Sequence, residues 1–254
     1  MTSDDKKLIY NLLKKADSCY YGYTRDVFKQ EPIFSDDKIL ETIEPNKSTI
    51  IIEHKNSVGQ KNLENEKTNG LTLENLNEKM IRCTRCVLAR TRNNVVPGMG
   101  VKNPLVLVIG EGPGHDEDIQ GLPFVGKAGI LLDKMLNAID LDRNKNCYIA
   151  NVVKCRPPEN RNPSAQEMDA CFSFLQTQIH ILKPKMILCM GKIAIEKLMN
   201  QSISITQSHG QFFEYNNIPV MPTYHPSALL RNTDLKRPAW EDLKKFKAKL
   251  EEFI

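Results

Sequence analysis

The chain is organised around Val106-Leu-Val-Ile-Gly-Glu-Gly-Pro-Gly-His-Asp-Glu-Asp118, with Gly121-Leu-Pro-Phe-Val-Gly-Lys-Ala-Gly129 shortly downstream. The apolar run at 105–109 is rich in β-branched residues and predicts a buried parallel strand. The strand is expected to stop at Gly110, because the Gly-Pro-Gly that follows does not fit the interior of a helix or strand. A glycine loop beyond the carboxyl end of a parallel strand lets the backbone approach a ligand closely.

The glycine spacing in this loop excludes the common nucleotide-binding fingerprints. No Gly-Lys-Ser/Thr follows, so the loop is not a Walker loop. Gly110, Gly112 and Gly114 alternate with other residues, whereas a dinucleotide fingerprint requires Gly-x-Gly-x-x-Gly. The expected ligand is therefore something other than a nucleotide pyrophosphate. An ordinary connection between a strand and a helix is the alternative for such a loop taken alone.

Composition places the chain among globular α/β proteins. Its 254 residues, 41% hydrophobic and 26% charged, suffice for one domain with a buried core and an extension. No apolar run approaches the roughly 18 residues of a membrane span. The N-terminus lacks the apolar core of a secretion signal, so we expect a cytoplasmic protein. A net charge of +4 and a pI of 8.6 allow a nucleic-acid partner without requiring one.

Residues 1–70 differ in composition from the remainder and are predicted to form an N-terminal extension. Leucines at helical spacing within 6–16 indicate a short amphipathic helix. The segment 44–69 is dominated by Asn, Lys, Glu and Ser, so we expect a disordered linker. A poorly ordered extension is the favoured interpretation, and a docking peptide for a protein partner is the alternative. The packed domain is assigned to 71–254 and is expected to be a monomer.

Helical and strand patterns alternate through the packed domain. Thr72 is a predicted N-cap, and Ser164 with Glu167 fits a capping box. Tyr215-Asn-Asn217 predicts a hairpin before the last strand. The expected fold is α/β, a three-layer α/β/α sandwich with a mostly parallel central sheet. The predicted helices lie at 73–81, 128–138, 164–182, 192–199 and 240–253, and the strands at 105–109, 148–153, 186–190 and 218–221.

Three polar loops follow predicted strands, at 110–118, 154–161 and 223–231. The carboxyl ends of parallel strands lie at the same edge of a sheet, so these loops are expected to meet there. Their convergence is the first indication of a functional site.

Seven cysteines in a chain without a secretion signal argue against a disulfide framework. Cys83-x-x-Cys86 lies at a predicted helix end, Cys155 lies in a loop and Cys171 in the helix that follows. Four thiolates suit zinc and an iron–sulfur cluster equally well. Zinc ribbons usually use two close pairs, so the wide spacing of the second pair favours iron–sulfur, and buried free thiols are the alternative. The remaining cysteines are expected to be free: Cys19, Cys147 and Cys189.

Several motifs occur in order along residues 71–253: Gly110-Glu-Gly-Pro-Gly114, Glu117-Asp118, Gly121-x-Pro-Phe-Val-Gly126, Asn151-Val-Val-Lys-Cys-Arg-Pro-Pro158 with Asn160-Arg161, and His225-Pro-Ser227 with Leu229-Leu-Arg-Asn232. With the cysteine spacing, they resemble the family 4 uracil-DNA glycosylases, the iron–sulfur type. The resemblance implies a base-excision-repair enzyme that flips uracil out of DNA and hydrolyses its N-glycosidic bond. It also implies a [4Fe-4S] cluster, with ligands Cys83, Cys86, Cys155 and Cys171.

The resemblance further implies the roles of a uracil pocket. Phe124 stacks on the extruded base, and the Asn151 side-chain amide bonds its edge in a pattern that cytosine does not offer. His225 hydrogen-bonds O2, where the charge of the leaving uracil anion collects. Core packing is the alternative for Phe124, a turn cap for Asn151 and a surface position for His225. The pocket is lined by the backbone of Glu111, Gly112 and Pro113.

Glu117 is implied to lie beside C5 of the base, where thymine carries its methyl group, and so to help reject thymine. Its alternative role is to place charge at a helix N-terminus. Leu229, Leu230 and Arg231 are implied to form a wedge that enters the groove, with Arg231 and Lys154 on phosphates. An ordinary helical turn is the alternative for the two leucines.

The residues leave the water-activating group open. Other uracil-DNA glycosylase families place Asp or Asn where Gly112 stands, and glycine cannot act as a base. Either leaving-group stabilisation by His225 carries most of the rate, which we favour, or Glu111 or Glu117 orients a water. The rival functions are a non-catalytic, cluster-bearing DNA-binding module and a glycosylase with broader specificity for deaminated bases.

Overall fold

The computed structural model describes residues 72–254. The predicted helix at 6–16 and the predicted linker at 44–69 lie outside the described residues, so the division of the chain at residue 70 stays a prediction. None of the described helices has the length and apolar character needed to cross a membrane.

A six-stranded sheet forms the centre of the described part of the chain. Its strands are β1 Met99–Gly100, β2 Val106–Gly110, β3 Cys147–Asn151, β4 Met186–Met190, β5 Phe213–Tyr215 and β6 Ile218–Thr223. They lie in the order β1-β3-β2-β4-β6-β5. The four inner strands are parallel, and β1 and β5 are antiparallel edge strands. The predicted, mostly parallel sheet is confirmed.

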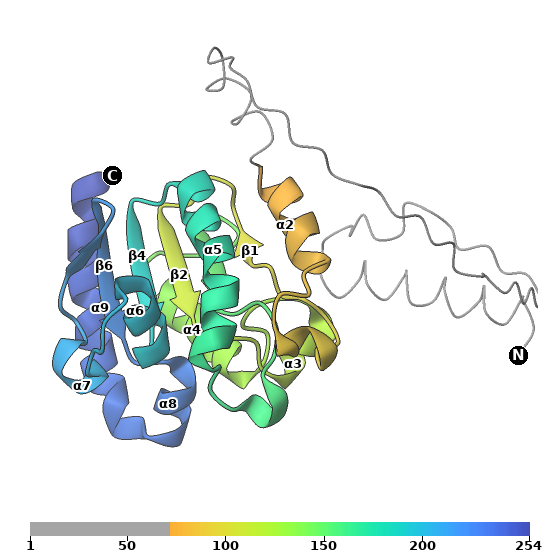
Figure 1. The fold of residues 1–254 in the computed structure, drawn as a ribbon. Coiled ribbons are helices and arrows are strands. Elements are labelled where there is room, and N and C mark those ends of the chain that lie inside the picture. The colour runs from red at the N-terminus through yellow and green to blue at the C-terminus, as the bar shows by residue number, and fades with distance from the viewer. Residues whose placement is uncertain (1–71) are drawn as a thin grey trace, which may run out of the picture. The chain divides into compact units, whose positions relative to one another are not determined.

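Helices cover both faces of this sheet (Figure 1). The α-helices are α2 Leu73–Ile81, α3 His115–Gln120, α4 Lys127–Asn137, α5 Ala165–Leu182, α6 Lys192–Met199, α7 Ile205–Ser208, α8 Pro226–Arg231 and α9 Lys236–Leu250. Leu107 and Ile109 share one buried cluster with α2, α5 and α6, whereas Val106 and Val108 share another with α4 and α9. Alternate residues of β2 thus face opposite layers, which explains why the strand is apolar throughout. The three-layer α/β/α sandwich is confirmed.

Local sequence signals explain where several elements begin. The Thr72 side chain accepts a backbone hydrogen bond at 3.2 Å, as its predicted N-cap role requires. Ser164 and Glu167 form the predicted capping box at the start of α5. Asn216 and Asn217 adopt φ values of 50° and 64° in the predicted hairpin turn, a conformation that asparagine tolerates better than most residues.

Several helices of the structure differ from the sequence prediction. The loop predicted at 223–231 contains α8, because Pro226 is pre-organised for a first helical turn. Helix α9 begins at Lys236 rather than at 240, since a 3-10 turn leads into it and Pro238 falls in the first turn, where its missing N–H is harmless. Helix α3 was not predicted, because its six residues are too few for an amphipathic pattern.

Candidate active site

Four parallel strands end at one edge of the sheet, as the strand pattern predicts. β2 ends at Gly110 beside Asn151 of β3, and β4 ends at Met190 beside Thr223 of β6. Because the strands are parallel, the segments that follow them emerge on the same side. Helices α3 and α8 lie at this edge, near the tip of the β2 arrow in Figure 1.

A glycine at the end of β2 brings predicted pocket residues together. A Cβ atom on Gly110 would lie 2.4 Å from Asn151 Oδ1 and 2.6 Å from Phe124 Cζ. Atoms in proteins do not pack that closely, so only glycine lets both side chains lie against this backbone. Phe124 and His225 are also neighbours, with ring centroids 5.5 Å apart and 33° between the ring planes. Phe124, Asn151 and His225, from three separate segments, thus form one cluster.

Phe124 is held in an unusual backbone conformation. Its φ of 52° lies in the left-handed region, which costs a non-glycine residue about 1–2 kcal/mol. Arg143 stabilises the turn, because Nη1 donates to Pro123 O at 2.9 Å and Nη2 donates to Phe124 O at 3.0 Å. Asp133 orients the guanidinium by accepting from Nε at 2.9 Å and from Nη2 at 2.7 Å. Sequence reasoning missed Arg143, since it belongs to no motif and meets Phe124 only in the folded chain.

Asn151 presents an unpaired acceptor at the end of β3. The residue is 1% exposed, and Oδ1 makes no hydrogen bond within the described structure. A buried polar atom left without a partner costs about 1–3 kcal/mol, so it is expected where a ligand supplies the missing donor. The backbone of Asn151 is fixed independently, because Lys154 Nζ donates to its carbonyl oxygen at 2.7 Å.

His225 is the N-cap residue of α8 and is held in one tautomer. Nδ1 accepts a hydrogen bond from Ser227 N at 3.2 Å and lies 2.8 Å from Ser227 Oγ. A ring nitrogen that accepts from an amide carries no hydrogen, so the neutral ring carries its hydrogen on Nε2. Burial lowers the pKa of His225 to about 4; the charge of Arg231 acts in the same direction, and Glu117 acts against both. The site therefore contains a neutral imidazole with one N–H donor.

The loop after β2 is anchored to the segment after β3. Val153 N donates to Glu111 O at 3.1 Å. A Cβ atom on Gly112 would lie 2.7 Å from Val153 Cγ2, so a larger residue there would push the two segments apart. Pro113 is buried. The predicted backbone wall at 111–113 therefore follows β2 and packs against the segment that follows Asn151.

The two glutamates of the first motif have different surroundings. Glu117 Oε2 accepts from Gly114 N at 3.1 Å, and Oε1 accepts from Val125 N at 2.8 Å and Gly126 N at 3.0 Å. These bonds fit the alternative role of Glu117 at a helix N-terminus, and they connect α3 to the turn that follows Phe124. The Glu111 carboxyl group has no hydrogen-bond partner among residues 72–254, and burial raises its pKa.

The prediction that Lys154 contacts phosphate is wrong. Lys154 is 1% exposed, and its Nζ donates to Asn151 O at 2.7 Å and to Gln178 Oε1 at 2.6 Å. Burial lowers its pKa to about 8. A lysine in a polar loop is normally exposed, and here the packing of α5 over the loop encloses it. Lys154 therefore connects the end of β3 to α5.

The predicted wedge is only partly exposed. Leu229 is 2% exposed and packs in the cluster shared with α4 and α9, so its assignment to the wedge is wrong. Successive residues of a helix face different directions, and Leu230, which is 48% exposed, points out of this core. Arg231 is also exposed. Leu230 and Arg231 are the two residues of the predicted wedge that are exposed.

The predicted ligand cysteines Cys83, Cys86, Cys155 and Cys171 line one cavity. Arg92 Nη1 donates to Cys155 Sγ at 3.2 Å, and the Lys154 side chain lines the same cavity. No three His, Cys, Asp or Glu side chains of residues 72–254 are grouped around a single point where one metal ion would bind. The thiols are arranged around a space that is also lined by three cationic residues, Arg85, Arg92 and Lys154, which can offset the charge of thiolates.

The other described cysteines are free, as predicted. Cys147 begins β3 and Cys189 lies within β4, and both are buried. Burial raises the pKa of Cys147 to about 12, so it remains a thiol. Cys19 lies outside the described residues.

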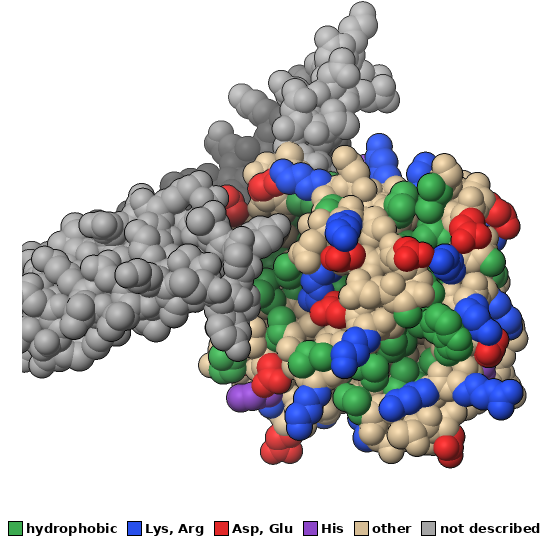
Figure 2. Space-filling model, turned by 180° about the vertical axis from the view of Figure 1, so that it is seen from behind, with side chains coloured by type: hydrophobic (Ala, Val, Ile, Leu, Met, Phe, Trp, Pro, Cys, Tyr) green, Lys and Arg blue, Asp and Glu red, His purple; other side chains and the backbone are tan. Residues whose placement is uncertain are grey.

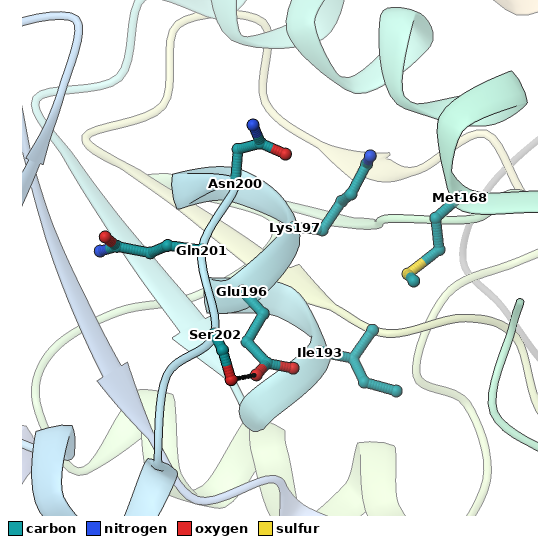
Figure 3. A pocket seen from close by; sticks show the side chains of 7 residues that line it. All are labelled: Met168, Ile193, Glu196, Lys197, Asn200, Gln201 and Ser202. Atoms are coloured by element: carbon teal, nitrogen blue, oxygen red, sulfur yellow. Dashed lines mark hydrogen bonds between the residues drawn. The ribbon is translucent and has the colours of Figure 1, made fainter. Parts of the chain in front are cut away.

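A second hollow lies on the described surface, lined by residues of α5, α6 and the segment after α6 (Figure 3). Its Glu196 accepts from Ser202 Oγ at 3.3 Å and from Ile203 N at 3.0 Å, and Lys197 pairs with Asp169. These charged side chains are paired within the protein.

On the face shown in Figure 2, basic and acidic side chains are interspersed, so no field of a single sign covers that face. The cluster at the strand ends is the candidate site.

The chain is similar to known proteins of one superfamily. The family model described as the uracil DNA glycosylase superfamily matches residues 97–244. A type-4 uracil-DNA glycosylase of Thermotoga maritima is 42% identical over 180 residues, which cover 69% of this chain and 93% of that protein. In Pyrobaculum aerophilum, a type-4 uracil-DNA glycosylase is 38% identical over 184 residues, covering 69% of this chain and 93% of its own. A type-5 uracil-DNA glycosylase of the same organism is 28% identical over 187 residues, which cover 61% of this chain and 82% of that protein.

The range matched by the family model contains the end of β2 and the residues gathered there, Phe124, Asn151 and His225. Similarity is higher to the type-4 than to the type-5 enzyme of one organism. The family resemblance inferred from the motifs is confirmed. The chain belongs to the uracil-DNA glycosylase superfamily and, within it, to the type-4 enzymes.

Proposed function

We propose that this protein excises uracil from DNA by hydrolysing the N-glycosidic bond, leaving an abasic site. The observation that carries the proposal is the buried, unpaired Asn151 Oδ1 beside the Phe124 ring. Uracil flipped out of DNA offers an N3–H donor to this oxygen and an O4 acceptor to the amide nitrogen. Cytosine presents an acceptor at N3 and a donor at its exocyclic amine. An Asn151 amide in this orientation therefore favours uracil over cytosine.

The leaving group is the second requirement of this reaction. Cleavage leaves an oxocarbenium-like sugar and a uracil anion whose charge collects on the carbonyl oxygens. We assign the neutral His225 to this charge, with Nε2–H donating to O2. The ring needs no change of protonation to act, because its pKa of about 4 keeps it neutral at physiological pH. Phe124 stacks on the base and helps exclude water from the developing anion.

Water activation is assigned to Glu111 in preference to Glu117. Both Glu117 oxygens accept backbone hydrogen bonds, and the group is therefore committed to the structure of the loop. Glu111 is unpaired among the described residues, and burial raises its pKa. A carboxylate with a raised pKa is a better proton acceptor for water. His225 is expected to supply the larger share of the rate, and Glu111 the smaller.

We propose a [4Fe-4S] cluster for the cavity lined by Cys83, Cys86, Cys155 and Cys171. The donor set supports it, because four thiols from three segments surround one space beside Arg92 and Lys154. The cluster supplies cross-linking of these segments rather than chemistry on the base. Cys155 lies four residues after Asn151, so the cross-link braces the strand end that reads uracil.

Contacts to DNA are assigned to the exposed residues of α8. Leu230 is a suitable wedge to occupy the space left by the extruded base, and Arg231 is suited to a phosphate. Action as a monomer in the cytoplasm and a protein partner for residues 1–70 stay predictions.

The test is incubation of the purified protein with single-stranded oligonucleotides that carry one U, T or hypoxanthine, followed by alkaline cleavage at abasic sites. We expect cleavage at U only. No cleavage of any oligonucleotide by folded protein would favour the non-catalytic module. Cleavage at hypoxanthine comparable to that at U would favour the broader glycosylase.

A further inference from the structure

A buried carboxylate outside the proposed pocket contacts the segment that carries His225. Asp242 of α9 is 1% exposed. Its carboxylate accepts from Thr223 Oγ1 at 2.7 Å and lies 2.9 and 3.0 Å from His209 Nδ1. A buried carboxylate is costly unless it is hydrogen-bonded, and here Thr223 and His209 both contact it. None of these partners takes part in the uracil contacts proposed above.

These contacts fix the end of β6. Thr223 is the last residue of the strand, two positions before His225. Asp242 holds its hydroxyl group, and Gly191 N donates to its carbonyl oxygen at 2.8 Å. Gly191 also lies against the histidine, since a Cβ atom there would be 3.1 Å from His225 Cβ. Thr223 is thus held through its side chain and its backbone.

The residue between Thr223 and His225 is fixed as well. Tyr224 is 7% exposed, and its ring lies 4.8 Å from the His209 ring at an interplanar angle of 39°. Next to His209, Gly210 N donates to Pro222 O at 2.9 Å. Only glycine can lie this close to β6 and α9, because a Cβ atom at position 210 would be 2.3 Å from the Asp242 carboxylate. One side chain, His209, therefore contacts both the carboxylate and the residue that precedes His225.

We propose that His209 and Asp242 form a positioning pair that places the His225 imidazole against the departing base. The proposal rests on the proposed function. In the described structure the His225 ring is hydrogen-bonded only to Ser227, within its own turn, so the position of the ring depends on where the backbone of 223–225 lies. A displacement of about 1 Å at a reacting group costs up to about 100-fold in rate. His209 and Asp242 act through His225 and touch no reacting atom.

The first test is the single-turnover rate of uracil excision with the full chain in excess over a uracil oligonucleotide. His209→Ala is expected to lower this rate at least about fivefold. His209→Asn should restore most of it, because the asparagine N–H can replace Nδ1–H towards Asp242. The His209 side chain is 25% exposed, so truncation leaves no fully enclosed cavity. Lys247→Ala is the matched control; it removes the 2.6 Å surface ion pair between α9 and Asp140 and should not change the rate.

A double-mutant cycle separates positioning from general support of the fold. In a His225→Ala background, His209→Ala should change the rate by less than about twofold, because no imidazole remains to be positioned. Thermal denaturation of each variant verifies that it is folded at the assay temperature. The same loss with and without His225, or a loss below fivefold in the wild-type background, would overturn the proposal. Failure of the wild-type protein to excise uracil would instead overturn the proposed function.

Discussion

The contribution of His225 to uracil excision should be nearly insensitive to acidification from about pH 7.5 to about pH 5. The reason is the His225 ring, which is half-buried, lies near the charge of Arg231, and accepts the Ser227 amide hydrogen at Nδ1. Protonation would place a second hydrogen where that amide already points. The neutral ring with its hydrogen on Nε2 is therefore the working form across this range.

The expected size of the effect follows from the pKa. At pH 5, a group with a pKa of about 4 is roughly 90% neutral, whereas an ordinary histidine with a pKa near 6.5 is about 3% neutral. The rate should therefore fall less than about twofold, against about 30-fold for an unshifted imidazole. The stability of the fold, unlike the rate, should fall clearly on acidification. The reason is that the unfolded chain takes up this proton near pH 6.5 and the folded chain only near pH 4. His225 should thus lower the free energy of unfolding by about 2 kcal/mol between pH 7 and pH 5.

The assay is single-turnover excision from a single-stranded uracil oligonucleotide, measured for wild type and His225→Ala at each pH. The ratio of the two rates isolates His225, because other titrating groups such as Glu111 affect both proteins. A flat ratio down to pH 5 is the expected result. A ratio that declines about 30-fold with a midpoint near pH 6.5 would refute the assignment of a neutral imidazole.

Gly110→Ala should lower the excision rate at least about tenfold with the fold retained, because the new Cβ would lie 2.4 Å from Asn151 Oδ1 and displace the amide; near wild-type kinetics with intact circular dichroism would contradict this. Leu229→Ala should lower the free energy of unfolding by about 2–5 kcal/mol in denaturant titrations. Leu230→Ala should change the free energy of unfolding by less than about 0.5 kcal/mol and slow excision from duplex DNA. If Leu229→Ala slowed excision and Leu230→Ala destabilised the fold, Leu229 would be the wedge and Leu230 the core residue. Cys155→Ser, or iron chelation, should remove absorbance near 400 nm and lower the melting temperature; a bound zinc ion without that absorbance would exclude iron–sulfur.

Several features of the fold follow from local sequence. Strand β2 and helix α5 are predictable because apolar periodicity and the Ser164–Glu167 capping box act over neighbouring residues. Helices α3, α7 and α8 were missed because they have only four to six residues. Helix α3 is bonded by Asn93 and Asn94 through Asp118, and Leu229 of α8 packs with residues of α4 and α9. Short elements stabilised by tertiary bonds have no periodic signal to detect.

The site was predictable in its members but only partly in their roles. Phe124, Asn151 and His225 were identified through motifs, and the structure places them together. Lys154 and Leu229 were assigned to DNA because residue type and spacing do not report burial. The supporting residues carried no sequence signal at all: Arg143, His209 and Asp242.

The sequence alone determined the parallel α/β architecture, the strand-end location of the candidate site and three residues that cluster there, Phe124, Asn151 and His225. These depend on periodicity, on turn chemistry and on motifs, all of which are local in the chain. Only the tertiary structure decided that Lys154 is enclosed, that Leu230 rather than Leu229 is exposed, and that the His225 ring is neutral. Burial and pKa depend on which distant side chains surround a group, and that information exists only once the chain has folded.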